Sequence, residues 1–329
     1  MKKALVLGAG GFIGSHLVKK LKHEGLWVRG VDLKYPLYSA TQADDFIIGD
    51  LRDQRLCCEI MKTHDIDDEP FDEVYQLAAD VGGAGYISTG EHDADIMQNS
   101  ALINLNVLTH SVDFQNQKKY KRIFYSSSTC VYSEDSQQND MKESSVYPAQ
   151  PDGNYGWEKL FSERLYLAFH KNYGVDVHIA RYHNIFGPEG TWEGGREKAV
   201  DAICRKIAEA KEGGEIQIWG DGTQIRSFLY IDECIEGTLQ LMRSDCTGPF
   251  NIGPESENIV TINDLTWMIQ SIADKSIKIK HIEGPEGMHK RVSNSRFIYE
   301  ELGWRSSRSL MEGLKKTYPW ILEQVKNKE

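Results

Sequence analysis

The chain has 329 residues, of which 40% are hydrophobic and 26% charged, a composition typical of a globular protein and too apolar for a disordered one. Its 38 lysines and arginines face 49 aspartates and glutamates, which gives a formal net charge of −11. Because no basic run stands out, neither nucleic acid nor a membrane surface is an expected partner.

The N-terminal sequence and the cysteines predict a reduced, cytoplasmic protein. Only residues 4–7 form an apolar run before Gly8, too short for a secretory core, and no stretch approaches the roughly twenty apolar residues of a membrane span. The six cysteines include no Cys-x-x-Cys pair, and the ten histidines form no His-Glu-x-x-His motif. We therefore expect neither a disulfide framework nor a structural metal.

The first half of the chain alternates β-rich runs with helical patterns. Strands are predicted at residues 4–7, 26–32, 45–49, 73–79, 121–127 and 175–181. Between them, apolar residues recur at helical spacing, as in the series Ile13, Leu17, Leu21, then Leu102, Leu105, Leu108, then Leu160, Leu165, Phe169. This alternation predicts an α/β protein with a Rossmann-type, doubly wound parallel sheet.

After about residue 184 the rhythm changes. A helix is predicted at 197–212, strands at 216–219, 227–230 and 250–252, a tight turn at 220–222, and a helix start at Thr261 with Asp264 three positions later. We interpret this part as a smaller α/β lobe interleaved with the first. The predicted first domain is 1–184, to which 228–253 return, and the second lobe is 185–227 with 254–329. A ligand is expected in the cleft between them.

A Gly-x-x-Gly-x-x-Gly pattern joins the first predicted strand to the first helix. Gly8, Gly11 and Gly14 frame it, with Phe12 and Ile13 at the start of the helix. Glycines there let the backbone turn tightly and approach a pyrophosphate, whose charge the helix N-terminus meets. The position of the loop predicts a dinucleotide site.

Two acidic residues at strand ends indicate which dinucleotide binds. Asp32 ends the second predicted strand, where a carboxylate accepts hydrogen bonds from an adenosine ribose and repels the extra phosphate of NADP. Asp50, followed by Leu51, ends the third and is placed near the adenine. The predicted cofactor is NAD.

A candidate catalytic group follows in the middle of the chain. Tyr155 and Lys159 are four residues apart and so lie on one face of the predicted helix. A phenol with an ordinary pKa of about 10 is a poor base, and a nearby ammonium stabilises its phenolate. Ser128, just after the fifth predicted strand, supplies a hydroxyl that can share the substrate proton.

With these motifs the chain resembles, nearly end to end, the extended short-chain dehydrogenase/reductase superfamily, which acts mostly on nucleotide sugars. The resemblance implies that Tyr155 is the base that deprotonates a sugar hydroxyl and that Lys159 also holds the nicotinamide ribose. It places Ser128 beside them. It also implies that the strand end at Leu77, Ala78 and Ala79 lines the cofactor.

A narrower set of motifs looks like the GDP-mannose 3,5-epimerase family. The most specific is the Gly-Gly-Arg-Glu-Lys segment at 194–198, joined by segments 81–85, 130–132, 182–188, 219–228 and 284–287. The resemblance implies that Cys130 and Lys198 are the acid/base pair of epimerisation and that the protein is a homodimer. It also implies that the sugar or the diphosphate is contacted by Gly83, Asn184, Glu197, Lys198, Lys206, Arg226 and Arg291.

The chemistry supports this role for Cys130 and Lys198. Oxidation at C4 of a hexose acidifies the hydrogens on C3 and C5, and inversion then needs a base on one ring face and an acid on the other. Cys130 lies two residues after Ser128, and an ordinary thiol has a pKa of about 8.5. Return of the hydride to C4 regenerates NAD. The cations Lys206, Arg226 and Arg291 would hold the diphosphate of a GDP-hexose against the negative net charge.

Two other functions remain open from the sequence. One is another nucleotide-sugar enzyme on this scaffold, a 4-epimerase, a 4-oxidase or a 4,6-dehydratase; similar dehydratases carry an Asp-Glu pair where this chain has Thr129 and Cys130. The other is a non-catalytic NAD-binding protein, against which the intact Ser128, Tyr155 and Lys159 speak. Apolar faces at residues 99–114 and 155–173 indicate a helical dimer interface.

Overall fold

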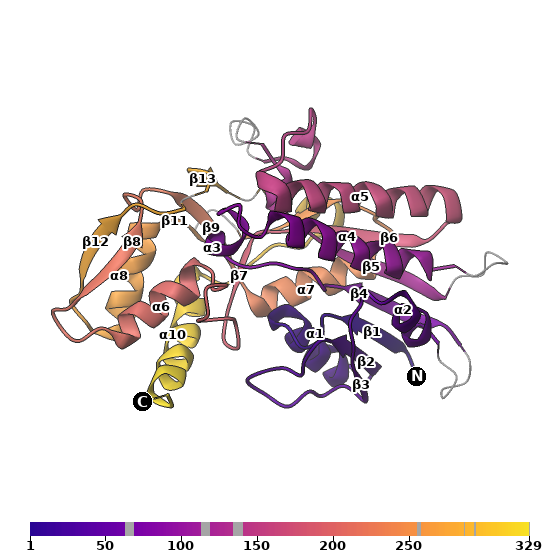
Figure 1. The fold of residues 1–329 in the computed structure, drawn as a ribbon, viewed down its shortest axis with the longest axis horizontal. Coiled ribbons are helices and arrows are strands. Elements are labelled where there is room, and N and C mark those ends of the chain that lie inside the picture. Colours follow the sequence, from indigo (N-terminus) through magenta and orange to yellow (C-terminus); the bar gives the residue numbers. More distant parts are fainter. Residues whose placement is uncertain are drawn as a thin grey trace.

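The computed structural model describes residues 1–62, 69–112, 119–133, 141–254, 258–285, 287–292 and 294–328. Figure 1 shows a larger part built on one sheet and a smaller part beside it. Glu286 of the predicted motif and residues 113–114 of the predicted dimer pattern lie outside the described ranges. Within those ranges, no helix is both long and apolar enough to cross a bilayer.

A seven-stranded sheet forms the larger part, in the order β10-β6-β5-β4-β1-β2-β3. All neighbouring strands are parallel. The strand order reverses between β1 and β4, the place where open α/β sheets bind ligands. This confirms the predicted Rossmann-type sheet, whose strands are β1 (Lys3–Leu7), β2 (Trp27–Asp32), β3 (Asp45–Ile48), β4 (Phe71–Gln76), β5 (Tyr120–Ser128), β6 (Asp176–Tyr182) and β10 (Phe250–Ile252).

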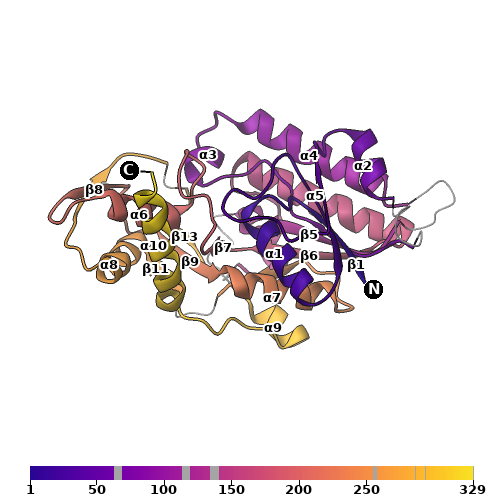
Figure 2. The same ribbon diagram turned by 90° about the horizontal axis from the view of Figure 1, so that it is seen from below.

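Helices cover both faces of the sheet because the strands are apolar on both sides. In β1, Ala4 and Val6 point into one core, and Leu5 and Leu7 point into the other. One face carries α1 (Phe12–His23) and α7 (Ile231–Met242), as Figure 2 shows from below. The opposite face carries α2 (Gln54–Ile60), α4 (Asp93–Thr109) and α5 (Gly153–Tyr173), while α3 (Ala84–Ile87) and the short turns η1 (Thr129–Val131) and η3 (Glu143–Val146) lie in connections.

Among the described residues, the smaller part holds two small sheets and three helices. The strands are β7 (Asn184–Phe186), β8 (Glu215–Trp219), β9 (Ile225–Tyr230), β11 (Ile259–Thr261), β12 (Lys278–Ile282) and β13 (Lys290–Arg291). The helices are α6 (Ala199–Glu209), α8 (Ile262–Ala273) and α10 (Leu310–Lys326), whereas α9 (Arg296–Leu302) packs against β10 of the large sheet. The predicted start of α8 is confirmed, because Thr261 and Asp264 form a reciprocal capping box.

Several boundaries differ from the prediction. The helix expected at 197–212 begins at Ala199, because Lys198 is its extended N-cap residue with ψ of 170°. The strand expected at 73–79 ends at Gln76, which leaves residues 77–79 in the loop beyond the strand. The sequence missed β7, β11 and β13, which have only two or three residues and therefore no readable periodicity. It also missed the five-residue strand β12.

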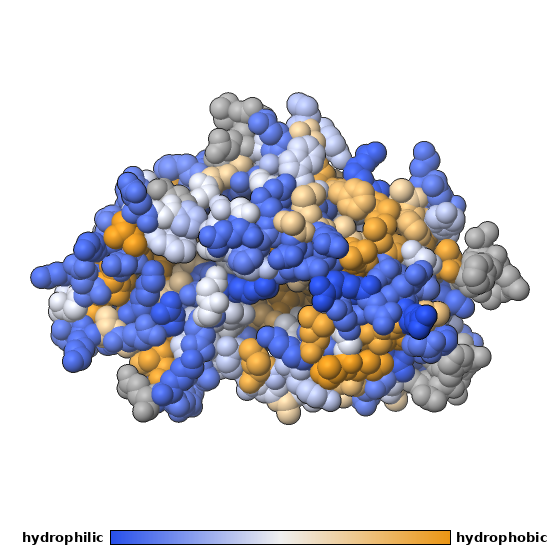
Figure 3. Space-filling model, viewed as in Figure 1, coloured by the Kyte–Doolittle hydropathy of each residue, from blue (hydrophilic) through white to orange (hydrophobic). Residues whose placement is uncertain are grey.

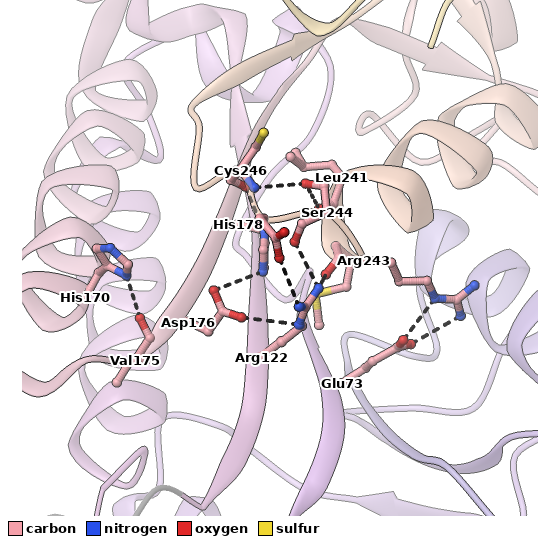
Figure 4. Close-up of polar contacts among 12 residues, drawn as sticks. Glu73, Arg122, His170, Val175, Asp176, His178, Leu241, Arg243, Ser244 and Cys246 are labelled. Atoms are coloured by element: carbon pink, nitrogen blue, oxygen red, sulfur yellow. Dashed lines mark hydrogen bonds and ion pairs between the residues drawn. The ribbon is translucent and has the colours of Figure 1, made fainter. Parts of the chain in front are cut away.

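Polar contacts fasten the connection between α7 and β10 to the amino ends of the strands, far from their carboxyl ends (Figure 4). The Arg122 guanidinium donates to the carbonyl oxygen of Ser244 at 2.9 Å. The His178 Nδ1 lies 2.8 Å from the carbonyl oxygen of Cys246. These contacts satisfy backbone groups of the loop and hold β10 in register against β6.

Candidate active site and cofactor pocket

The glycine loop is shaped for close approach to a phosphate. Gly8 has a φ of +89°, and a Cβ on Gly14 would lie only 2.0 Å from the carbonyl oxygen of Gly8. Gly11 caps α1 without any side-chain hydrogen bond, so the first N–H groups of the helix remain available. The cradle therefore fits a pyrophosphate at a helix N-terminus, as the sequence predicts.

Asp32 lies at the end of β2, beside this loop. One of its carboxylate oxygens, Oδ2, accepts a hydrogen bond from the Gly10 N–H at 3.0 Å. Burial raises the pKa of Asp32, although the N–H groups of Gly10 and Lys34 act in the opposite direction. At the end of β3, Asp50 forms an ion pair with Arg52 at 2.6 Å. Both acids line one cavity with Leu51, in the places predicted for ribose and adenine contacts.

That cavity has a volume of about 610 Å³, and its lining residues extend along the edge of the sheet where a dinucleotide would lie. It runs from the glycine loop past the ends of β2, β3 and β4 to residues of the smaller part. All predicted cofactor residues outside the catalytic helix line it, namely Gly8, Gly11, Phe12, Ile13, Gly14, Asp32, Asp50, Leu51, Leu77, Ala78 and Ala79. The chain thus brings these dispersed positions together.

A second cavity, of about 210 Å³, adjoins the first and holds the predicted catalytic residues. Ser128 ends β5, and Tyr155 and Lys159 lie on the first turns of α5. The Lys159 Nζ donates to the carbonyl oxygen of Ser126 at 2.9 Å and lies 5.7 Å from the centre of the Tyr155 ring. Tyr155 and Ser128 share a hydrogen bond. The three side chains therefore form one cluster.

The charge balance around Tyr155 differs from the sequence argument. Burial raises the pKa of Tyr155, and nearby Cys130 and Glu158 add to that effect, while Ser128 and Arg291 oppose it. Burial also lowers the pKa of Lys159. Burial therefore outweighs the groups that lower the pKa of Tyr155. Stabilisation of its phenolate by Lys159 stays a prediction.

Cys130 follows this cluster by one short turn. The thiol is buried and lines the second cavity. The Arg291 Nη1 donates to its sulfur at 3.3 Å, and the same guanidinium pairs with Asp152. The thiol therefore has a charged hydrogen-bond partner within the site. Ser128 in turn accepts a hydrogen bond from the backbone N–H of Cys130 at 3.2 Å.

Lys198 enters from the smaller part and lines both cavities. Although the side chain is exposed toward these open spaces, desolvation by the surrounding protein lowers its pKa, and the charge of Asp201 acts in the opposite direction. A lysine whose pKa is lowered exchanges protons more readily near neutral pH. The geometry therefore places the side chains of Cys130 and Lys198 around the same cavity as Tyr155.

The predicted sugar-nucleotide residues separate into two groups. Gly83, Asn184, Arg226 and Arg291 line the second cavity, and Arg226 and Arg291 are paired neighbours on β9 and β13. Glu197 and Lys206 line neither cavity. The Glu197 carboxylate accepts from Gly195 and Arg205, and the Lys206 Nζ donates to the carbonyl oxygen of Gln217 at 2.7 Å.

Two further residues lie at the site without having been assigned a role from the sequence. Asp152 holds Arg291, but an aspartate before a helix is ordinarily read as its N-cap. His183 is buried, its Nδ1 lies 3.2 Å from the Ser227 hydroxyl, and it lines the second cavity. Burial and the charge of Arg291 lower the pKa of His183 to about 3, so this imidazole is neutral.

Comparison with known proteins bears directly on this arrangement. The model of the NAD dependent epimerase/dehydratase family matches residues 4–253. The chain belongs to this family. It is 41% identical to a GDP-mannose 3,5-epimerase of Arabidopsis thaliana, over 99% of this chain and 84% of the plant protein. Similarity to a GDP-mannose 3,5-epimerase 1 of Oryza sativa subsp. indica is 40%, over 98% of this chain and 82% of the other.

Two solved structures share the fold over nearly the whole chain. A UDP-glucose 4-epimerase of Thermotoga maritima, solved with UDP-glucose, superposes with a TM-score of 0.82 at 26% identity, covering 98% of this chain and 99% of that one. A UDP-glucuronic acid 4-epimerase of Bacillus cereus, solved with UDP-glucuronic acid and NAD, gives 0.80 at 26% identity with the same coverage. Both sequence-based expectations, the superfamily and its NAD-dependent chemistry, are confirmed.

Proposed function

We propose that the protein is an NAD-dependent epimerase that inverts a GDP-hexose, GDP-mannose above all, at C3 and C5 through a 4-keto intermediate. One observation carries the proposal: the Cys130 thiol and the Lys198 ammonium line the same cavity as Ser128, Tyr155 and Lys159. A 4-epimerase needs only the last three, whereas inversion beside a ketone needs an additional acid and base. The similarity to plant GDP-mannose 3,5-epimerases supports the same conclusion.

The first step is assigned to the cluster on β5 and α5. Bound NAD would accept a hydride from C4 of the sugar and return it at the end of the cycle. Tyr155 removes the proton of the C4 hydroxyl, and Ser128 hydrogen-bonds the same oxygen. Lys159, fixed by the carbonyl oxygen of Ser126, supplies positive charge beside the phenol and holds the ribose.

The inversion steps are assigned to Cys130 and Lys198. With the ketone formed, the hydrogens on C3 and C5 become acidic, so one group removes a proton and the other delivers one to the opposite face. Arg291 orients the Cys130 sulfur through its hydrogen bond at 3.3 Å. The lowered pKa of Lys198 suits a group that gives and regains a proton in each turnover.

The nucleotide diphosphate is assigned to the arginines at the cavity. Arg226 and Arg291 come from adjacent strands at paired positions, and planar guanidinium groups bind phosphate oxygens with two parallel hydrogen bonds. Asn184 and Gly83 line the same space for the sugar. Glu197 and Lys206 stay proposed contacts of the sugar nucleotide. Because neither residue lines a cavity, such contacts would require their side chains to move.

The assembly and location of the protein complete the proposal. We propose a homodimer formed by α4 and α5, which pack side by side and expose Met97, Leu102, Leu105, Trp157 and Phe161. Figure 3 shows apolar side chains gathered over this face. The domain division, 1–184 with 228–253 against 185–227 with 254–329, and the cytoplasmic location are likewise proposals from the sequence.

The deciding experiment is incubation with GDP-mannose in deuterated water, followed by NMR of the sugar. We expect deuterium at both C3 and C5 without net accumulation of NADH, because the hydride is returned to C4. Deuterium at neither carbon, with any GDP-hexose, would refute the proposal. Inversion at C4 without deuterium at C3 or C5 would instead identify a 4-epimerase, and loss of water from the sugar a 4,6-dehydratase.

A further inference from the structure

A cluster of side chains joins the two parts of the molecule at the rim of the cofactor cavity. The Arg196 guanidinium donates to the Asp80 carboxylate at 3.0 Å and to the Tyr86 hydroxyl at 2.6 Å. It also lies over the Tyr86 ring, 3.8 Å from the ring centre. The Tyr86 hydroxyl donates to the same carboxylate at 2.9 Å. We call Arg196, Asp80 and Tyr86 the clasp.

The first domain holds its half of the clasp firmly. The Asn99 amide, on α4, donates to the second Asp80 oxygen at 2.8 Å, and the Asp80 N–H donates to the Ser100 hydroxyl at 3.0 Å. Although burial acts in the opposite direction, hydrogen bonds from Asn99 and Tyr86 and the charge of Arg196 lower the pKa of Asp80. The carboxylate is therefore ionised at neutral pH, the form that pairs with Arg196.

Backbone contacts also connect the two parts of the molecule at this place. The Gly83 N–H, at the start of α3, donates to the carbonyl oxygen of Arg196 at 3.0 Å. A Cβ on Gly83 would lie 2.1 Å from the carbonyl oxygen of Glu197, so the two backbone segments are too close for a side chain at position 83. Lys198 is the next residue. Its backbone is thus fixed from the cofactor domain and not only by its own helix, α6.

The clasp contributes to the wall of the larger cavity. Asp80 and Arg196 line that cavity, and Gly82 and Lys198 line both cavities. A dinucleotide bound in the larger cavity would have the glycine loop on one side and these residues on the other.

Resting on the function proposed above, we infer that Arg196 is a positioning residue that docks the second lobe onto the cofactor domain. It holds Lys198 in front of the sugar and retains NAD between turnovers. Retention suits a reaction in which the hydride returns to the same substrate. Arg196 itself need not touch the reacting carbons, because its guanidinium is occupied by Asp80 and Tyr86.

The test uses Arg196→Gln, with Arg296→Gln as the matched control, since Arg296 pairs with Glu300 on the exposed side of α9. The first readout is the rate at which bound NAD exchanges with excess labelled NAD. We expect at least about tenfold faster exchange in Arg196→Gln, the effect of losing one charge-assisted hydrogen bond. The control should match the unaltered protein.

The second readout separates positioning from general damage. After mixing with GDP-mannose, deuterium incorporation at C3 and C5 is compared with transient NADH formation. We expect the ratio of the two rates to fall about tenfold in Arg196→Gln, because a displaced Lys198 impairs proton transfer and leaves Tyr155 in place. Arg196→Lys should rescue part of the loss, since an ammonium reaches Asp80 but lacks the planar fork.

Equal NAD exchange in Arg196→Gln and Arg296→Gln would overturn the inference, and so would a parallel loss of NADH formation and deuterium incorporation. Should Arg196→Gln fail to fold, Tyr86→Phe, which removes one oxygen, decides the question by the same two readouts. The NAD-exchange measurement needs no sugar. If the unaltered protein formed no deuterated GDP-hexose, the proposed function would fail while the clasp would still be judged by this arm.

Discussion

At the scale of single residues, burial sets the protonation chemistry of this site. Desolvation raises the pKa of Tyr155 and lowers that of Lys159 and Lys198. Each shift favours the uncharged form, so the pKa values of the two lysines move toward neutrality while that of Tyr155 moves away from it. Cys130 has a charged neighbour, because Arg291 donates a hydrogen bond to its sulfur.

We predict that Cys130→Ala abolishes inversion without abolishing oxidation. Loss of a general acid or base costs on the order of 10²–10⁴-fold in rate, so deuterium incorporation at one or both carbons should fall by that factor. NAD binding and transient NADH formation should persist, since Ser128, Tyr155 and Lys159 remain. Cys58→Ala, on α2 and away from both cavities, is the control. Undiminished exchange in Cys130→Ala would contradict the role of the thiol.

Asp201 gives a prediction for pH. It is buried on α6, its Oδ1 has no hydrogen-bond partner among the described residues, and burial raises its pKa to about 8. The unfolded chain releases this proton at the ordinary carboxyl pKa of about 3.9. Between these values the folded state binds a proton that the unfolded state lacks, so stability falls as pH rises through the window and levels off above it.

We expect Asp201→Asn to remove this pH dependence. Urea unfolding at a series of pH values gives the free energy of unfolding of both proteins. As the pH rises toward about 8, that of Asp201→Asn should increase relative to that of the unaltered protein by about 1–3 kcal/mol, the cost of a buried polar group without a partner. Asp245→Asn, fully exposed, is the control and should leave the slope unchanged. Parallel pH profiles of Asp201→Asn and the unaltered protein would rule out the titration.

At the scale of elements, the site depends on where strands and helices stop. β1, β4 and β5 end at the same sheet edge, and the chain beyond each strand end lines a cavity. α1 and α5 begin there, and α6 begins opposite them, directly after Lys198. Residues from distant positions meet because parallel strands share their carboxyl edge.

The junction of β1 and α1 has no tolerance for a side chain. In Gly14→Ala the new Cβ would lie 2.0 Å from the Gly8 carbonyl oxygen, which must move and distort the phosphate cradle. We expect NAD affinity to fall at least about tenfold, the equivalent of about 1.4 kcal/mol, as measured by calorimetric titration. Lys20→Ala, on the exposed side of the same helix, should bind NAD normally. Normal binding by Gly14→Ala would show that the loop does not hold the pyrophosphate.

At the scale of the whole molecule, the two parts form one site without a single connecting linker. The chain passes from the large sheet to the small part at β7 and returns to the sheet at β10. It then crosses again to α8 and α10 (Figures 1 and 2). This interleaving, together with the clasp, lets residues from both parts face the same cavity.

The proposed dimer is also tested at this scale. Leu105→Arg places a charge in the exposed apolar face of α4, where burial against a second copy would desolvate it. Light scattering of the eluting protein should show a dimer for the unaltered chain and a monomer for the variant. Leu37→Arg, in the exposed loop after β2, is the matched control and should stay dimeric. A monomeric unaltered protein would refute the proposed interface.

The sequence by itself determined the alternation of strands and helices, the glycine loop and the spacing of Tyr155 and Lys159, because these depend on local periodicity and on neighbours within one helical turn. The motif at 194–198 indicated the narrower family. Only the tertiary structure decided that Arg291 reaches the Cys130 sulfur, that Arg196 pairs with Asp80, and that Glu197 and Lys206 line neither cavity. The first two contacts join residues more than a hundred positions apart, and they depend on chain crossings that no local pattern encodes.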